Sequence, residues 1–442
     1  MTTAQASEKA SIYQLSLRVF TPEGTLRAAA KMLPFLAKLG PRYIQLTPVV
    51  LADDDTDLAG WSERQKRSMT GNPHNNYRIK DYFAVDPEYG TADDLHGFIR
   101  AAHRLGLRVL MDLVYFHCGP NNVFLAEHPE FVKRNPDGTP FTGEWHFPVI
   151  NFDSPATREY LWKNMVHFIE DYDADGYRCD VGDYVPLDFW REGIRRCRAV
   201  KPDTFMLNEG RNPDYLNVFD ANYFYDGCFD TVPTAKGEIT AREFRDKWEA
   251  CRGKLPEGGR MLHFIDNHDV CSDGGENRHE RVIGTPGVEA CLAVNFLLDG
   301  VPFVFNGYEV CDELKHSMFA NRFYGRDAAV NWANALTGKG ERRFRLMQKL
   351  FAMKREEPAL ASTKIQWLEN DRPEAVLSFI RPDIKSPLLV IVNLRGDPLA
   401  VRVKAVAFCP GEGLLEENAR ASFGEDGLTL QMLGYGYWAA RL

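Results

Sequence analysis

Short apolar segments that alternate with amphipathic segments of helical length are the feature that most constrains this fold. For example, the stretch 93–105 has helical periodicity and stops at Gly106, and the following segment 107–116 is apolar apart from Arg108 and Asp112. Apolar strands that alternate with amphipathic helices are typical of a parallel sheet covered by helices. The pattern predicts strands over 12–20, 43–48, 107–116, 176–180, 204–209, 260–266 and 301–306, and helices over 25–39, 93–105, 155–171, 188–200 and 338–355.

Roughly eight such units fit a (β/α)8 TIM barrel better than an open doubly wound sheet, because no glycine-rich phosphate loop follows the first strand. The stretch 119–154 is rich in Pro, Gly and Asn without helical periodicity, which predicts a short excursion after the third strand. From about residue 365 the period becomes two, which is typical of antiparallel strands. We therefore expect a barrel over 1–117 and 155–360, an excursion over 118–154, and a C-terminal antiparallel, β-sandwich-like domain over 361–442.

Charge and composition argue against several classes of partner. The chain of 442 residues has a net charge of −9, which disfavours nucleic acid and anionic membrane surfaces and suits a neutral substrate. No apolar run is long enough to span a bilayer, and the first ten residues lack the apolar segment of a signal peptide. The nine cysteines occur singly, without Cys-x-x-Cys spacing. We therefore expect a cytoplasmic protein with reduced, mostly buried thiols.

Arg178 and Asp180 stand at the end of the predicted strand 176–180, where alternation places both on one face of the sheet. An ordinary ion pair at the end of a strand would explain them. A catalytic explanation also exists, because a carboxylate nucleophile must stay ionised and a neighbouring guanidinium keeps its pKa low. The pair alone leaves both explanations open.

Ionisable residues also stand at the ends of other predicted strands. Asp112 and His117 lie at the end of the strand predicted over 107–116, Glu209 ends that over 204–209, and Asn-His-Asp at 267–269 follows that over 260–266. Each has an ordinary explanation as a structural, loop or turn residue. In a (β/α)8 barrel, however, the C-terminal ends of the strands meet at one mouth, where active sites lie. The coincidence predicts an active site that contains the carboxylates of Asp180, Glu209 and Asp269.

Several segments, in order along the chain, resemble motifs of the α-amylase family of retaining glycoside hydrolases (family 13). The segments are 77–91, 111–117, 176–180, 207–210 and 264–269. The family's second motif is Gly-x-Arg-x-Asp, and its fourth ends in Asn-His-Asp. The resemblance extends from Ile12 to the C-terminus. It implies a (β/α)8 barrel with the excursion as domain B, the β region as the C-terminal domain, and α-glycosidase activity.

The resemblance also implies a role for each matching residue. Asp180 would be the nucleophile that forms a covalent glycosyl-enzyme, and Glu209 the acid that protonates the leaving oxygen and then activates water. Asp269 would stabilise the oxocarbenium-like transition state, and Arg178 would keep Asp180 ionised. The residues implied to contact the −1 sugar are His117 and His268 as hydroxyl donors, Tyr77 as a stacking platform, and Arg326. Packing at a strand end is the structural alternative for the histidines, and ordinary burial is the alternative for Tyr77.

The first motif departs from the family at a metal ligand. In the family, an Asn of this motif and an Asp before the third helix bind a structural calcium ion, and here Phe116 and Val149 stand at those positions. Calcium takes oxygen ligands, and neither of these side chains carries one. We therefore expect that the usual calcium site is lost, that apolar packing replaces it, and that the protein needs no cofactor.

The stretch after Asp180 departs as well. Many starch-degrading members have a Lys-His pair there that holds the aglycone, whereas residues 181–184 read Val-Gly-Asp-Tyr. We therefore expect different acceptor subsites. Trp61 and Trp145, in loops at the same mouth, are candidates either for sugar platforms or for anchors of their loops.

The resemblance favours a retaining hydrolase of α-1,4-glucans or malto-oligosaccharides, so that the expected partner is a small or polymeric α-glucan. An α-glucosyl transferase or an α-glucosidase acting on short sugars would use the same residues. A non-catalytic sugar-binding relative is a further alternative, against which the three retained carboxylates argue. A catalytic metal site is disfavoured because the sequence has no close His-x-His or His-x-x-x-His pair.

Overall fold

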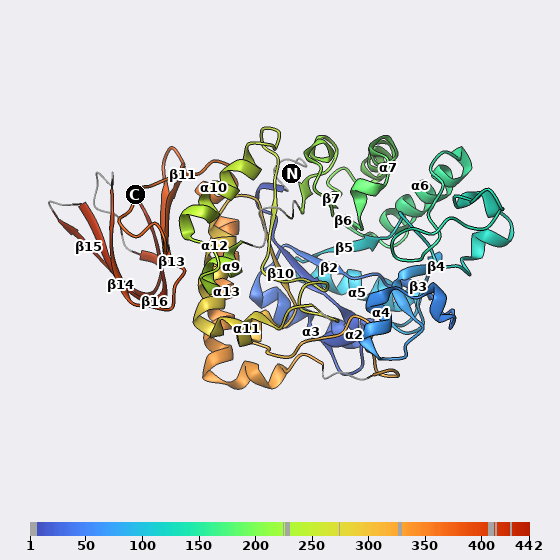
Figure 1. Ribbon diagram of the computed structural model, residues 1–442, viewed down its shortest axis with the longest axis horizontal. Coiled ribbons are helices and arrows are strands. Elements are labelled where there is room, and N and C mark those ends of the chain that lie inside the picture. The colour runs from blue at the N-terminus through green and yellow to red at the C-terminus, as the bar shows by residue number, and fades with distance from the viewer. Residues whose placement is uncertain are drawn as a thin grey trace.

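The computed structural model describes the chain apart from residues 1–6, 224, 226–229, 274, 326–328, 405–410, 412 and 425–426. Figure 1 shows a barrel, a small excursion next to it, and a C-terminal sheet on the far side of helices α12 (Gly284–Leu297) and α13 (Gly338–Glu356). No helix of the described chain is both long and apolar enough to cross a membrane.

The barrel consists of eight parallel strands in the order β8-β7-β6-β5-β2-β1-β10-β9. A parallel bridge between Asn222 and Met261 joins the two ends of this order and closes the barrel. The predicted (β/α)8 fold is therefore confirmed. The strands are β1 (Ile12–Leu15), β2 (Tyr43–Leu46), β5 (Arg108–Leu113), β6 (Gly176–Cys179), β7 (Phe205–Asn208), β8 (Ala221–Asn222), β9 (Leu262–His263) and β10 (Val301–Phe305).

The helices predicted over 25–39, 93–105, 155–171, 188–200 and 338–355 form within one residue of these bounds, whereas the long helices α10 (Ala241–Arg252) and α12 were not predicted. Helix α3 (Leu26–Leu39) starts after Thr25, whose side chain accepts a hydrogen bond from the amide of Ala28, and stops at Gly40, whose φ is 103°. Helix α5 (Ala92–Arg104) begins with a capping box at Thr91. The other barrel helices include α6 (Pro155–Glu170), α7 (Leu187–Val200) and α10 (Ala241–Arg252).

The first predicted strand, 12–20, is wrong in its second half. Strand β1 ends at Leu15, and the short helix α2 (Leu17–Phe20) follows. The amide of Ser16 donates to the side chain of Asn306 instead of continuing the ladder, and helical spacing buries both Leu17 and Phe20. The apolar residues of this segment therefore serve a helix that continues from the strand.

The connection between β2 and α5 contains regular secondary structure. Strands β3 (Val50–Asp53) and β4 (Asn75–Val85) form an antiparallel pair, and helix α4 (Glu63–Ser68) lies between them in the chain. The excursion 118–154 contains 3₁₀ turns at Val123–Ala126 and Pro129–Phe131. An isolated bridge between His117 and Val149 links it to the segment that follows β5, and a bridge between Val132 and Ile150 lies within it.

The C-terminal sheet is antiparallel and contains β11 (Gln366–Trp367), β12 (Val376–Arg381), β13 (Leu388–Asn393), β14 (Leu399–Val403), β15 (Gly413–Gly424) and β16 (Gly427–Arg441). Strand β16 continues through Gly434. Gly434 does not form a turn but allows two backbones to approach, because a Cβ built on it would lie 2.0 Å from the carbonyl oxygen of Gly396.

The C-terminal sheet shares its core with the barrel. One hydrophobic cluster contains Val294 and Phe296 of α12 together with Val390 of β13 and Tyr437 and Ala439 of β16. Helix α12 is buried on nearly all sides because the barrel covers one face and this sheet covers another. The sheet therefore supports the helical layer behind the strands that carry the candidate site.

Candidate active site

The predicted site residues follow neighbouring barrel strands and meet at one cavity. Asp180 directly follows β6, Glu209 directly follows β7, and the register places Arg178 of β6 opposite Asp112 of β5. The cavity has a volume of about 500 Å³. Its lining includes six of the predicted residues, namely Asp180, Glu209, Asp269, Tyr77, His117 and His268.

A single guanidinium joins three carboxylates beneath the cavity. Nη1 of Arg178 lies 2.8 Å from Oδ1 of Asp112 and 2.7 Å from Oδ1 of Asp180, and Nη2 lies 2.7 Å from Oε2 of Glu209. The Arg178 side chain is fully buried. The two predicted catalytic carboxylates are therefore held by opposite nitrogens of one planar cation, which fixes their relative position.

The charge balance of this group differs from the expectation that Arg178 keeps the pKa of Asp180 low. Burial raises the pKa of Asp180 well above its usual value, and the negative charges of Glu209 and Asp112 add to this effect, although Arg178 opposes it. Burial likewise raises the pKa of Asp112 to about 6 against the opposing effect of Arg178. One cation cannot balance three buried carboxylates, so the group favours retention of a proton near neutral pH.

Glu209 is held from two further sides. The amide of Val181 donates to Oε2 at 2.8 Å, and the hydroxyl of Tyr225 donates to Oε1 at 2.5 Å. No local pattern indicates Tyr225 as a site residue, because it follows a strand of only two residues, β8. These contacts position the carboxyl group next to the turn that follows Asp180.

Asp269 also has an unexpected partner. Arg64, in the first turn of α4, lies 2.5 Å from Oδ1 of Asp269 and donates to the carbonyl oxygens of His268 at 3.2 Å and Asp269 at 3.1 Å. Burial acts to raise the pKa of Asp269, but the neighbouring positive charges, including Arg64, outweigh it and lower the pKa to about 2. Asp269 is therefore ionised at any pH at which the protein would work.

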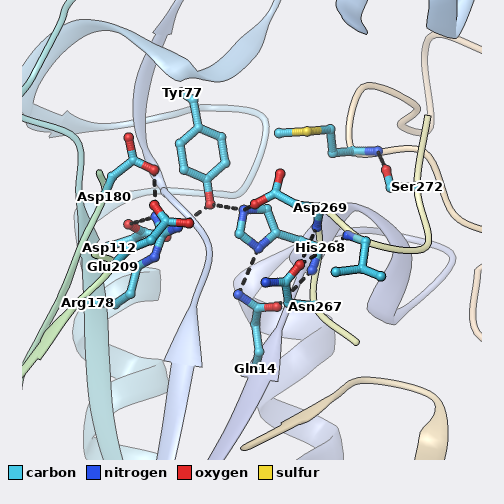
Figure 2. Close-up of polar contacts among 12 residues, drawn as sticks. Gln14, Tyr77, Asp112, Arg178, Asp180, Glu209, Asn267, His268, Asp269 and Ser272 are labelled. Carbon is cyan, nitrogen blue, oxygen red and sulfur yellow. Dashed lines mark hydrogen bonds and ion pairs between the residues drawn. The ribbon is translucent and has the colours of Figure 1, made fainter. Parts of the chain in front are cut away.

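Gln14 of β1 fixes the orientation and the tautomer of His268 (Figure 2). Its Oε1 accepts a hydrogen bond from the amide of His268 at 3.0 Å, so its Nε2 faces Nδ1 of His268, 2.9 Å away. The imidazole must therefore accept at Nδ1 and carry its proton on Nε2, which lies 2.7 Å from the hydroxyl of Tyr77. Tyr77 in turn donates to Oδ2 of Asp112 at 3.0 Å.

The other predicted sugar contacts have different outcomes. The ring of Tyr77 is parallel to that of His268, with 5.2 Å between the centroids, so its role as a sugar platform stays a prediction. His117 lies 2.9 Å from the carbonyl oxygen of Tyr77 through Nε2, and burial lowers its pKa to about 4. The neutral ring thus donates to the protein and offers an acceptor at Nδ1, which does not fit the expected role of hydroxyl donor. Arg326 lies outside the described residues.

The two tryptophans noted in the sequence, Trp61 and Trp145, lie in different environments. Trp61 is buried, and its indole nitrogen donates to the carbonyl oxygen of Asp55 at 2.9 Å, so it anchors its loop. Trp145 lines the cavity. Trp145 therefore remains the candidate for contact with a sugar.

The residues at the family's calcium position do not fit a calcium ion. The ring of Phe116 packs 5.0 Å from that of Tyr184, centroid to centroid. A Cβ built on Gly143 would lie 3.2 Å from Cγ2 of Val149 and 3.7 Å from Cε1 of Phe116, so both side chains flank one glycine. Among the described residues, no three His, Cys, Asp or Glu side chains are grouped as a metal site. Neither Phe116 nor Val149 carries a side-chain oxygen that could bind calcium at this position.

Comparisons with known proteins agree with this arrangement. The family described as "Alpha amylase, catalytic domain" matches residues 4–137. The α-amylase MalA of Haloarcula japonica is 27% identical over 96% of this chain and 61% of its own length, so this chain spans about three fifths of that relative. Malto-oligosyltrehalose trehalohydrolase of Deinococcus radiodurans is 27% identical over 92% of this chain and 76% of its own length.

Among solved structures, the maltogenic α-amylase AmyB of Thermotoga neapolitana has a TM-score of 0.82 at 23% identity, over 98% of this chain and 99% of AmyB. This likeness shows that the fold is shared along the whole chain. The family match, the relatives and the shared fold together show that the chain is similar to the α-amylase family of glycoside hydrolases.

Proposed function

We propose that this protein is a retaining glycoside hydrolase that cleaves α-glucosidic bonds in α-1,4-glucans or malto-oligosaccharides. The observation that carries the proposal is the shared guanidinium of Arg178, which holds Asp180 and Glu209 at 2.7 Å each beside a cavity of about 500 Å³. Retaining enzymes need two carboxyl groups about 5–5.5 Å apart, and one guanidinium that bridges both carboxylates is compatible with such a separation. Names of relatives such as MalA support an α-glucan as the substrate.

The proposed reaction assigns one task to each carboxyl group. The ion pair with Arg178 involves Oδ1 of Asp180, which leaves Oδ2 to attack the anomeric carbon. Glu209, held by Tyr225 and Val181, gives a proton to the leaving oxygen and later takes one from water. Asp269, kept ionised beside Arg64, stabilises the positive charge that develops on the sugar ring.

Substitution of the two carboxylates tests this assignment. Asp180→Asn and Glu209→Gln should each lower kcat on maltotriose by at least about a hundredfold, because each removes a group that acts on the reacting atoms. Circular dichroism should show that both variants fold. Glu416→Gln, which changes an exposed carboxylate on β15, is the matched control and should keep full turnover. Near-normal kcat in either site variant would refute the assignment.

We also propose that apolar packing of Phe116 and Val149 replaces the family's structural calcium, so that the protein folds and works without that ion. Dialysis against EDTA should leave both the melting temperature and the turnover of maltotriose unchanged. Readdition of calcium should likewise change neither the melting temperature nor the turnover. A fall in melting temperature with EDTA that calcium reverses would contradict the proposal.

A further inference from the structure

A second cavity lies at the opposite end of the barrel from the candidate active site. It has a volume of about 670 Å³. Glu8 and Arg260 of its lining precede β1 and β9, so they stand at the N-terminal ends of parallel strands, whereas the proposed catalytic carboxylates follow their strands. The other polar side chains of the wall come from the end of α10, from the loop after it and from the segment that enters the C-terminal sheet, and they are Arg252, Glu257, Ser362, Thr363 and Lys364.

Arg260 is buried in the wall of this cavity, and one of its donors is unused. The residue is 6% exposed. Its Nη2 donates to the carbonyl oxygen of Ala361 at 2.9 Å, but its Nη1 has no hydrogen-bond partner within the part of the chain that the structure describes. Burial lowers the pKa of Arg260, and the charge of Arg252 acts in the same direction. A buried cation with an unused donor is costly unless a ligand supplies an acceptor.

Two further buried cations lie against the same segment of the wall, residues 360–364. Successive carbonyl oxygens of this segment accept hydrogen bonds from Lys354, Arg260 and Arg381. Burial lowers the pKa of Lys354 well below its usual value, and the charges of Arg260 and Arg381 lower it further. The three cations therefore share one poorly compensated region.

The nearby carboxylates do not balance this charge. Asp299 is fully buried, but its oxygens already face Nε2 of His263 at 3.1 Å and Nη1 of Arg252 at 3.5 Å. Glu8 is half-buried and Glu257 is exposed, so water screens their charges. The whole chain has a net charge of −9, which makes the excess of buried cations a local feature of this end of the barrel.

We propose that this cavity binds a phosphate group, with Arg260 and Arg252 as guanidinium donors and Lys364 as a further cation. Planar guanidinium groups bind phosphate oxygens through paired N–H donors. A phosphate carries up to two negative charges near neutral pH, so it balances more of the buried positive charge than a carboxylate does. Free phosphate and the phosphate ester of a small metabolite share this chemistry, and the volume of the cavity leaves room for an ester. This site goes beyond the proposed function, because none of the proposed catalytic residues belongs to it.

Isothermal titration calorimetry of the whole protein with inorganic phosphate and with glycerol 3-phosphate, at constant ionic strength, tests the proposal. Both ligands should bind to the wild-type protein. Tighter binding of glycerol 3-phosphate would identify an ester as the ligand, and equal affinities would identify free phosphate. Arg260→Met should weaken the binding of both at least about tenfold, because it removes charged donors from a buried position.

Two substitutions of exposed lysines keep the test independent of folding. Lys364→Met removes a cation from the wall and should weaken binding about threefold. Lys254→Met removes the same charge from the loop after α10, outside the lining, and should change the affinity by less than about twofold.

The same titrations contain the results that would overturn the site. Absence of binding of either ligand at millimolar concentration would do so. Equal weakening in Lys364→Met and Lys254→Met would do so as well, since it would show attraction to general surface charge. If circular dichroism shows that Arg260→Met does not fold, the comparison of the two lysine variants decides alone.

Discussion

At the scale of single residues, a chain of hydrogen bonds runs from Gln14 through His268 and Tyr77 to Asp112. Each hydrogen atom in this chain has a single possible donor. The amide of Gln14 donates to Nδ1 of His268, Nε2 of His268 donates to Tyr77, and Tyr77 donates to Asp112. Burial lowers the pKa of His268 to about 4, so the ring is neutral over the range in which glycosidases work. Gln14 is thus a positioning residue that orients a site histidine from outside the cavity lining.

Gln14→Glu should reverse the preference of His268 for the neutral form. The carboxylate would still accept from the amide of His268, but its second oxygen would face Nδ1 and could not donate to it, so the protonated imidazole becomes favoured. We expect the pKa of His268 to rise from about 4 by at least one unit, which corresponds to about 1.4 kcal/mol. NMR titration of the imidazole resonances measures this shift directly.

His103 is an internal control in the same spectra. Its hydrogen bond to Asp175 raises its pKa above the ordinary value, and it lies far along the chain from Gln14, so it should titrate identically in both proteins. An unchanged titration of His268 in Gln14→Glu would show that Gln14 does not set its protonation.

The residues that the sequence could identify are those fixed by strand ends. Asp180, Glu209 and Asp269 follow strands whose position in a barrel is determined by topology, so their convergence follows from the fold class. Arg64 and Tyr225 could not be identified, because one lies on a six-residue helix within a long connection and the other follows a two-residue strand. No hydrophobic periodicity in the sequence marks either residue, because only tertiary contacts bring its side chain to the site.

At the scale of elements, β6 depends on one glycine. Gly176 has a φ of 145°, and a Cβ built on it would lie 1.9 Å from the carbonyl oxygen of Phe205 in β7. No side chain fits there without separating β6 from β7. The close approach at this end of the strand pair sets the register that brings Arg178 and Asp180 next to Glu209.

Gly176→Ala should therefore lower the free energy of unfolding by about 3 kcal/mol or more, through overlap with the backbone and strain in φ. Gly97→Ala is the matched control, because Gly97 lies within α5 and a Cβ there would have no atom within 4 Å. That change should raise the stability by about 0.5–1 kcal/mol through helix propensity. Urea unfolding measures both, and equal effects would contradict the argument.

Element prediction succeeded where local signals determine the structure. Helices such as α3 and α5 have caps and apolar periodicity within their own sequence, so their bounds could be predicted closely. Strand β8 has two residues and is defined by its pairing with β7, which no local pattern records, whereas only Leu262–His263 of the strand predicted over 260–266 forms a paired strand, as β9. A similar reason explains why the segment of α2 was expected to continue strand β1. The end of β1 depends on the hydrogen bond from the amide of Ser16 to Asn306, a residue distant in the sequence.

At the scale of the whole molecule, a buried arginine joins the C-terminal sheet to the barrel. Nη1 of Arg381, in β12, donates to the carbonyl oxygen of Leu297 at 2.8 Å, and Nε donates to that of Lys364 at 3.1 Å; Leu298 and Ser362 also accept from this guanidinium. Burial lowers the pKa of Arg381 to about 10, yet the group stays charged at neutral pH. The carbonyl oxygens at the end of α12 stabilise this charge.

Arg381→Met should lower the free energy of unfolding by about 3 kcal/mol or more, because several buried carbonyl groups lose their donor. Because barrel and sheet share one core, both should unfold in a single transition by tryptophan fluorescence and by circular dichroism. Arg420→Met, at an exposed position on β15, should leave the stability within about 0.5 kcal/mol. Two separate transitions in the wild-type protein would contradict the shared core.

The burial of α12 between the barrel and the C-terminal sheet has a consequence for biosynthesis. Part of its apolar surface is covered by β13 and β16, which leave the ribosome only after the barrel sequence is complete. At about 5–20 residues per second, that surface stays uncovered for on the order of ten seconds. A nascent chain of this protein therefore passes through a stage with a nearly finished barrel and an exposed apolar helix, which is the kind of surface that chaperones bind.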